Sequence, residues 1–268
     1  MIRTCQRQSR LNRFACCGAN LWLEIRGDRQ DLRLRSNHCG DRLCVPCGIA
    51  RARIITDNIL RHCQPIHLRF ITLTLRHSPT SLRDQLDRLY RSFQALRRRR
   101  SFSAAVTGGA AFCEIKVSER TGRWHVHLHC LVQGTFIDQH ALSREWLAVT
   151  GDSSIVDIRS VPDKERVTSY VVKYVTKPAD ATVFADPEKL DELCVSLKRR
   201  RLCMTWGSWR GFRLEEVQQD GHTWQAVGNL WHLFSQARDG DALALRWVDA
   251  IALKWPDLSL IDTAARPP

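Results

Sequence analysis

The most constraining feature of this sequence is the segment Trp124–Val132, in which three histidines alternate with apolar residues. Successive side chains of a β-strand point to opposite faces, so His125, His127 and His129 would share one face. The apolar residues between them would point into a core. The pattern therefore predicts a central strand with a core on one side and a cluster of imidazoles on the other.

A second apolar segment, residues 110–118, precedes this strand, and four residues with turn chemistry, 119–122, separate the two. This arrangement predicts an antiparallel hairpin. With the turn centred in that linker, the numbers of opposed residues sum to about 241, which places Glu114 near His127 on the same face. A carboxylate beside two imidazoles suits Mg²⁺ or Mn²⁺ in catalysis. We predict Glu114, His127 and His129 as the ligands of a catalytic metal.

The surrounding sequence alternates strand and helix patterns in the order β-α-β-β-α-β-α. This order predicts an α+β fold, in which a central antiparallel sheet carries helices on one face in a ferredoxin-like style. Ser81 is the expected N-cap of the first helix because its side chain can accept a backbone hydrogen bond. The remaining elements are expected as strands at 66–75 and 154–161 and helices at 81–100, 138–149 and 163–177.

The last of these helices repeats a tyrosine–lysine unit, with Tyr170 and Lys173 followed by Tyr174 and Lys177. Four-residue spacing puts the tyrosines on one helix face and the lysines on the adjoining stripe. Tyrosine can attack phosphorus as a covalent nucleophile, and lysine can stabilise phosphate charge or help deprotonate the phenol. Tyr174 lies between both lysines, whose charge would lower the pKa of its phenol. We predict Tyr174 as the first nucleophile and Tyr170 as the second.

A cysteine cluster near the start of the chain has metal-ligand spacing, at Cys39, Cys44 and Cys47. Thiolates select Zn²⁺, and a closed tetrahedral site needs a fourth ligand. Cys17 is the predicted fourth ligand, because a strand-like segment after it returns the chain to Cys39. A redox-active pair and unliganded buried cysteines are the alternatives to a structural zinc site. The rival candidates for the fourth ligand are Cys5, Cys16 and His38.

Positive charge is concentrated in the first part of the chain. The whole sequence carries a net charge of +13, and residues 61–110 alone hold 10 basic and 2 acidic side chains. Such a field suits the phosphate backbone of a nucleic acid. No apolar run approaches the roughly 20 residues that a membrane helix needs. We expect a cytoplasmic protein of a prokaryotic host cell that binds DNA and no membrane.

These patterns together resemble the HUH endonuclease superfamily, and in particular the rolling-circle replication initiators of plasmids and single-stranded DNA phages. Residues 71–75 match the first motif of that family, residues 127–132 the second, and residues 170–177 the third in its two-tyrosine form. Some plasmid members carry an acidic residue where Tyr170 stands, so this chain is closer to the phage type. The resemblance covers roughly residues 35–210. The cysteine-rich N-terminal segment of this chain also looks like that of plasmid members of the family.

The resemblance implies metal-dependent nicking and rejoining of one strand of origin DNA through a 5′-phosphotyrosine. It implies Glu114, His127 and His129 as metal ligands and Tyr174 and Tyr170 as nucleophiles. The sequence contains no helicase-type phosphate-binding loop, so a host helicase and a host polymerase are expected partners. A two-tyrosine HUH transposase is the main alternative. From other classes, a histidine-triad nucleotide hydrolase and a non-catalytic zinc-containing DNA-binding module remain possible.

Three regions are therefore expected along the chain. Residues 1–55 form a cysteine-rich, zinc-binding, basic segment that contacts DNA. Residues 56–180 form the endonuclease domain. Residues 181–268 form a mostly helical region without an assigned role.

Overall fold

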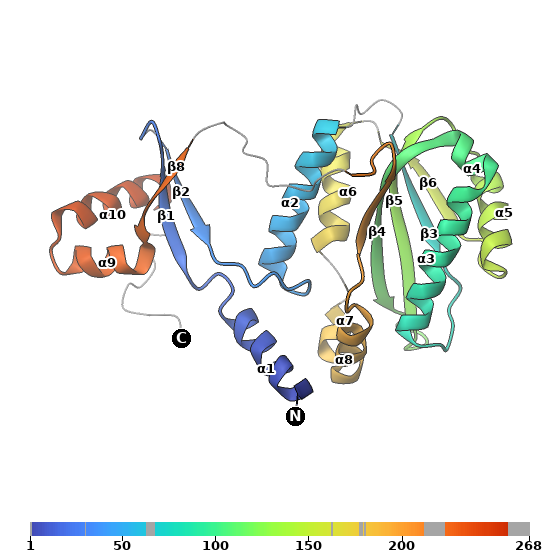
Figure 1. The fold of residues 1–268 in the computed structure, drawn as a ribbon, viewed down its shortest axis with the longest axis horizontal. Helices are drawn as coiled ribbons and strands as arrows, with labels where there is room; N and C mark the ends of the chain where they lie inside the picture. Colours follow the sequence, from blue (N-terminus) through green and yellow to red (C-terminus); the bar gives the residue numbers. More distant parts are fainter. Residues whose placement is uncertain are drawn as a thin grey trace. The chain divides into compact units, whose positions relative to one another are not determined.

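The computed structural model describes residues 2–29, 31–62, 68–161, 163–176, 179, 181–211 and 223–256. The chain forms two compact units (Figure 1). The smaller unit combines residues 1–47 with residues 218–268, and the larger unit comprises residues 48–217. The boundaries of these units differ from those of the three regions expected from the sequence. The separate roles of those regions stay a prediction.

A five-stranded antiparallel sheet forms the centre of the larger unit, in the strand order β6-β3-β5-β4-β7. The predicted hairpin is present as β4 and β5, and β5 occupies the middle of the sheet. The predicted α+β class with a central antiparallel sheet is confirmed. The strands are β3 (Leu68–Thr74), β4 (Val106–Val117), β5 (Trp124–Gly134), β6 (Val156–Ser160) and β7 (Cys203–Gly207).

Helices cover both faces of this sheet, so the expectation of helices on one face is wrong (Figure 1). Helices α3 and α5 lie against one face, while α2 and α6 lie against the other. The reason is that β5 is apolar on both sides: Leu128 and Leu131 point to opposite faces, and both are fully buried. The helices are α2 (Val45–His62), α3 (Leu82–Arg98), α4 (Arg100–Ala105), α5 (Gln139–Thr150), α6 (Lys164–Thr176), α7 (Ala181–Ala185) and α8 (Pro187–Ser196).

Local capping explains where two of these helices begin. The Ser81 hydroxyl accepts a hydrogen bond from the backbone N–H of Asp84 at 3.2 Å, which confirms the predicted N-cap of α3. The carboxylate of Asp138 caps α5 in the same way, accepting from the N–H of Ala141 at 2.7 Å. Helix α5 ends at Gly151, whose φ of 82° is a left-handed conformation that favours glycine.

The smaller unit contains a three-stranded antiparallel sheet in the order β2-β1-β8. Strand β8 comes from the far end of the chain and pairs with β1, so segments about two hundred residues apart share one sheet. Leu23 of β1 is fully buried in a core with residues of α9 and α10. The elements are α1 (Ile2–Ala15), β1 (Leu21–Arg26), β2 (Leu32–Ser36), β8 (Trp224–Asn229), α9 (Leu230–Arg238) and α10 (Ala242–Lys254).

None of the helices in the described part of the chain combines the length and the apolar character that crossing a membrane requires.

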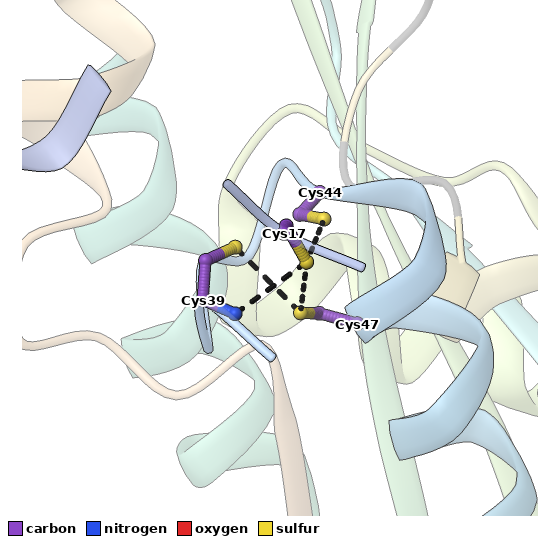
Figure 2. A group of neighbouring side chains, drawn as sticks. All are labelled: Cys17, Cys39, Cys44 and Cys47. Atoms are coloured by element: carbon purple, nitrogen blue, oxygen red, sulfur yellow. Dashed lines mark hydrogen bonds between the residues drawn. The ribbon is translucent and has the colours of Figure 1, made fainter. Parts of the chain in front are cut away.

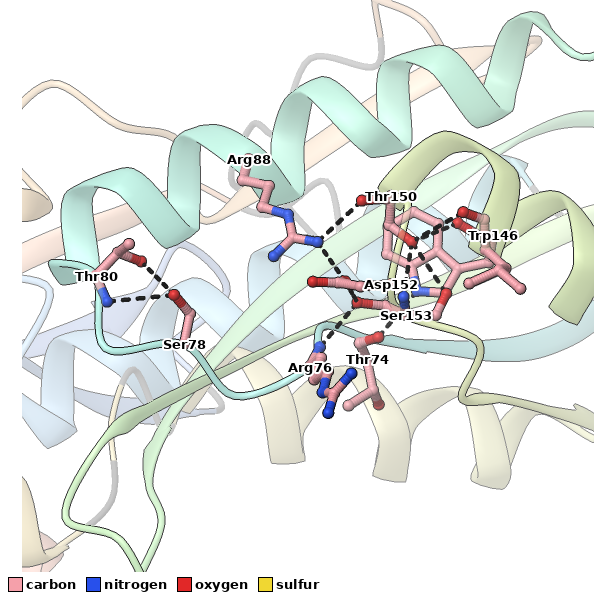
Figure 3. Close-up of polar contacts among 10 residues, drawn as sticks. Thr74, Arg76, Ser78, Thr80, Arg88, Trp146, Thr150, Asp152 and Ser153 are labelled. Carbon is pink, nitrogen blue, oxygen red and sulfur yellow. Dashed lines mark hydrogen bonds and ion pairs between the residues drawn. The ribbon is translucent and has the colours of Figure 1, made fainter.

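A hydrogen-bond network fixes the end of β3 in the larger unit (Figure 3). The indole N–H of the fully buried Trp146 in α5 donates to the backbone carbonyl of Thr74 at 2.9 Å. Just beyond, the backbone N–H of Arg76 donates to the hydroxyl of Ser153 at 2.9 Å. The N–H of Ser153 in turn donates to the Thr150 hydroxyl at 3.1 Å. The network therefore holds the end of β3 against the loop that follows α5.

We predict that Trp146→Phe lowers the free energy of unfolding by about 1–3 kcal/mol, because the substitution removes a buried donor and part of a core side chain. Urea unfolding followed by circular dichroism measures the loss. Leu147→Ala is the matched control on the same helix, since Leu147 is 42% exposed, and it should change stability by less than about 0.5 kcal/mol. Equal losses in the two variants would contradict the role given to the indole.

Candidate active site and cysteine cluster

The register of three strands brings the predicted polar residues together. Glu114 of β4 pairs with His127 of β5, which confirms the pairing predicted from the hairpin turn. On the other side of β5, Thr74 of β3 pairs with His127 and Thr72 pairs with His129. All five side chains therefore lie on the sheet face that α6 covers.

Hydrogen bonds hold both imidazoles in place. His129 Nε2 lies 2.9 Å from the Glu114 carboxylate, and its Nδ1 lies 3.1 Å from the Thr72 hydroxyl. His127 Nδ1 lies 3.1 Å from the Thr74 hydroxyl. At His127, a Thr74 hydroxyl that accepts from Nδ1–H leaves Nε2 with a lone pair, which is the state that a metal ligand needs. At His129, Nε2–H donates to the Glu114 carboxylate and Nδ1 accepts from the Thr72 hydroxyl. The two threonines and Glu114 therefore fix the orientation of both rings.

Burial and neighbouring charges set the protonation of this group. Burial acts to raise the pKa of Glu114, but the hydrogen bond with His129 and the charge and hydrogen bond of Lys116 contribute to lowering that pKa to about 2. Burial lowers the pKa of His127 to about 3 and that of His125 to about 4. Lys116 Nζ lies 3.2 Å from the Glu114 carboxylate. At neutral pH the site holds a carboxylate and neutral imidazoles, the forms that bind a metal.

The donor chemistry of Glu114, His127 and His129 fits a divalent cation, with one carboxylate and two neutral imidazoles on one face. The rings of His127 and His129 are stacked, with centroids 6.0 Å apart and an interplanar angle of 16°. Among the described residues, only the cysteine cluster brings three or more possible ligand atoms within 4.8 Å of one another. Joint coordination would therefore require His127 to turn toward the pair formed by Glu114 and His129.

Aromatic stacking places both tyrosines of α6 beside these histidines. The Tyr174 ring stacks on His129, with centroids 3.7 Å apart and an interplanar angle of 23°. Tyr170 stacks on Phe70 of β3 at 4.2 Å, and Phe70 also contacts Tyr174 at 5.4 Å. The two tyrosines share one helix face, as predicted. Lys173 Nζ lies 5.2 Å from the centroid of the Tyr174 ring.

The predicted lowering of the Tyr174 pKa by the two lysines is wrong. Burial raises the pKa of this phenol, and the negative charge of Glu114 raises it further. Tyr174 is only 9% exposed, because α6 presses it onto the sheet. Lys116 and Arg159, from β4 and β6, are the cations that act in the opposite direction. Lys177 lies outside the described residues.

Several residues of the site were not found by sequence reasoning. Lys116 follows Glu114 by two residues, so strand alternation on β4 could have placed it on the same face. Phe70 and Arg159 are paired across β3 and β6, and only the fold brings them to α6. The His125 ring contacts His77 at 4.0 Å and His127 at 4.1 Å.

The four predicted cysteines converge in the smaller unit (Figure 2). The Sγ atom of Cys47 lies 3.6 Å from those of Cys17 and Cys39, and the Sγ atoms of Cys44 and Cys17 are 3.4 Å apart. Four sulfurs at Zn–S distances of about 2.3 Å form a tetrahedron with edges of about 3.8 Å. The backbone N–H of Asp41 also points at Cys39 Sγ, at 3.4 Å. The geometry fits a tetrahedral thiolate site.

The alternatives for the fourth position are less suitable. Cys16 is exposed. His38 Nδ1 lies 3.8 Å from Cys47 Sγ and is not part of the four-sulfur group. Burial acts to raise the pKa of Cys47, but hydrogen bonds with His38, the Gly40 backbone and two neighbouring cysteines together outweigh it and lower that pKa to about 6. His38 therefore supports a neighbouring thiolate. The side chain of Cys5 lies outside the described residues.

A sequence model of the family described as "Replication protein" matches residues 31–249. The chain belongs to the replication protein family. The matched range contains the histidine strand, the tyrosine helix and three of the four clustered cysteines, while Cys17 precedes it. No curated protein matches the chain. No solved structure matches it.

Membership of this family supports the replication initiator role expected from the sequence, with DNA as the partner. The protein therefore carries two groups of chemically active side chains. The histidines and tyrosines lie in the larger compact unit, and the cysteine cluster lies in the smaller one.

Proposed function

We propose that this replication protein initiates rolling-circle replication by nicking and rejoining one DNA strand through a 5′-phosphotyrosine. The observation that carries the proposal is the stacking of Tyr174 on His129 at 3.7 Å, while His129 is hydrogen-bonded to Glu114 at 2.9 Å. A nucleophile of the type that attacks phosphorus thus adjoins a carboxylate–imidazole group of the type that binds a divalent cation.

Glu114, His127 and His129 would hold Mg²⁺ or Mn²⁺, which supplies Lewis-acid polarisation of the scissile phosphate. Tyr174 Oη bonds to phosphorus and gives up its proton as the P–O3′ bond breaks, and the departing 3′-oxygen leaves as a hydroxyl. Because the pKa of Tyr174 is raised, this phenol stays protonated at neutral pH until the phosphate arrives. Lys173, beside the ring, contributes positive charge toward the phosphate.

The covalent linkage retains the energy of the phosphodiester bond, so the strand can be rejoined without ATP. The free 3′-hydroxyl primes a host polymerase, and a host helicase separates the strands. A second cut releases the displaced strand after one round. Tyr170 lies one helical turn from Tyr174, about 6 Å away by helix geometry, and its stacking on Phe70 orients it to the same sheet face. The two tyrosines would then attack in alternation, each on the other's linkage.

The cysteine cluster has a structural role in this proposal. Cys17, Cys39, Cys44 and Cys47 hold one Zn²⁺, which joins the start of β1 to the start of α2 within a segment rich in arginine. Residues 1–47 carry nine arginines and four acidic side chains, so the zinc-stabilised segment contributes to DNA binding. A two-tyrosine transposase would use the same chemistry, but membership of the replication protein family favours initiation.

Metal binding should depend on the threonine that orients His129. We predict that Thr72→Val lowers Mn²⁺ affinity by about 10- to 100-fold, because the imidazole loses the hydroxyl that holds its ring orientation. Isothermal titration of the chelator-treated protein with Mn²⁺ measures the affinity, and EDTA should abolish nicking. Thr107→Val is the matched control, since Thr107 is exposed on β4 and its hydroxyl bonds to the Gln133 carbonyl at 3.1 Å. Full nicking activity of a His127→Ala/His129→Ala double variant in EDTA would contradict the assignment of these residues as metal ligands.

The zinc assignment predicts that Cys44→Ser or Cys47→Ser loses about one zinc per chain and lowers the melting temperature of the protein. Metal analysis by plasma mass spectrometry and thermal unfolding give the two readouts. Cys16→Ser, which removes an exposed thiol next to Cys17, should change neither. Zinc content unchanged in both cluster variants would show that the ligands lie elsewhere.

Tyr174 is the proposed first nucleophile because its ring stacks on His129, whereas that of Tyr170 stacks on Phe70. We predict that Tyr174→Phe loses most initial nicking of single-stranded origin DNA, while Tyr170→Phe nicks but terminates poorly. Denaturing gels with Mn²⁺ report the covalent adduct. The third tyrosine of the chain provides the control: Tyr90→Phe should nick normally, because Tyr90 donates to the Arg201 carbonyl in another part of the unit. If only Tyr170→Phe loses the first cut, the order of the two tyrosines is reversed. A covalent adduct on the Tyr170→Phe/Tyr174→Phe double variant would contradict the tyrosine mechanism.

A further inference from the structure

The small sheet of β2, β1 and β8 has two chemically different faces. On one face, Leu23 of β1 and its neighbours form the core with α9 and α10. Strand alternation sends the intervening side chains to the other face. There Trp22 pairs with Arg35, and Glu24 pairs with Arg33. On the opposite side of β1, Trp224 of β8 pairs with Arg26 and joins the same face.

Contacts within this face hold the planar groups in place. The carboxylate of Glu24, only 8% exposed, accepts a hydrogen bond from Arg33 Nε at 2.6 Å and lies 3.6 Å from Arg35 Nη1. The Arg33 guanidinium lies over the Trp224 ring, with Cζ 4.3 Å from the centroid. Glu24 thus organises two guanidinium groups between two indoles. Trp22 is 36% exposed and the Arg35 side chain is 68% exposed, so both remain accessible.

These groups suit a single strand of nucleic acid. Indole rings and guanidinium planes on an open sheet stack with unpaired bases, and arginine also binds phosphate. Trp22 and Trp224 are separated by four residues along the sheet and one strand across it, about 14 Å, which spans a few nucleotides. A duplex keeps its base faces stacked, out of reach of the indoles. The excess of arginine in residues 1–47 is complementary in charge to a polyanion such as DNA. An apolar protein surface would offer no negative charge for these arginines.

We propose that the outer face of the β2-β1-β8 sheet binds single-stranded DNA, with Trp22 and the stacked Arg33–Trp224 pair offering planar groups to bases and Arg35 contacting phosphates. This surface belongs to the smaller unit, whereas the tyrosines and histidines belong to the larger one. The inference rests on the proposed function only in taking DNA as the polymer. The surface would hold the strand opened at the origin without reading its sequence.

The test uses the full chain, loaded with zinc, and fluorescence anisotropy with a short labelled oligothymidylate. Trp22→Ala/Trp224→Ala should raise the Kd for this single strand at least about fivefold, the lower bound for losing one stacked base. Arg35→Ala should reduce the slope of log affinity against log salt by about 0.7. Arg246→Ala, which removes an exposed arginine on α10 of the same unit, should leave the Kd for the single strand unchanged.

The conservative variant Trp22→Phe/Trp224→Phe guards against misfolding, since phenyl rings still stack, and it should bind the single strand within about twofold of the unchanged protein. Weakening equal to that of the alanine pair would overturn the stacking role. Unchanged binding by the alanine pair would overturn the surface itself, and equal weakening on a duplex of the same length would overturn the single-strand assignment. Oligothymidylate binding is measured without nicking, so its outcome is separate from that of the nicking mechanism.

Discussion

The antiparallel register of β3, β5 and β4 decides which polar side chains meet in this protein. A slip of one residue would exchange the two faces of β5, burying the histidines against α3 and turning Leu128 and Cys130 toward α6. Both of these residues are fully buried, so the core opposes such a slip. The same register places Glu114 opposite His127 and Thr72 opposite His129. The packing of apolar residues on one face of the sheet thereby determines which polar side chains meet on the other face.

Helix α6 completes the site by covering the histidine face. Its tyrosines stack on Phe70 and His129, and this packing positions the phenols. The same burial raises the pKa of Tyr174, so positioning and ease of deprotonation oppose each other. Lys116 and Arg159, which lie on strands of the sheet, act to lower the pKa of Tyr174. The cations that favour deprotonation of this phenol therefore come from strands of the sheet.

Local patterns in the sequence were enough to predict the hairpin, the pairing of Glu114 with His127 and the convergence of Cys17 on the other cysteines. Each depends on strand alternation, turn position or ligand spacing over short stretches of chain. Features that depend on tertiary packing were missed or wrong. Helices on both faces, the pairing of β8 with β1, and the contacts of Thr72 are set by distant segments. The direction of the Tyr174 pKa follows from burial, which the lysine spacing did not reveal.

The most direct test of the central claim is to identify the residue that carries the DNA. The protein would be incubated with single-stranded origin DNA and Mn²⁺, digested with nuclease and protease, and mapped by mass spectrometry. The proposed function predicts a nucleotide attached through its 5′-phosphate to the Oη of Tyr174. A nucleotide on His125, His127 or His129 would instead indicate the chemistry of a histidine-triad hydrolase and contradict the tyrosine mechanism.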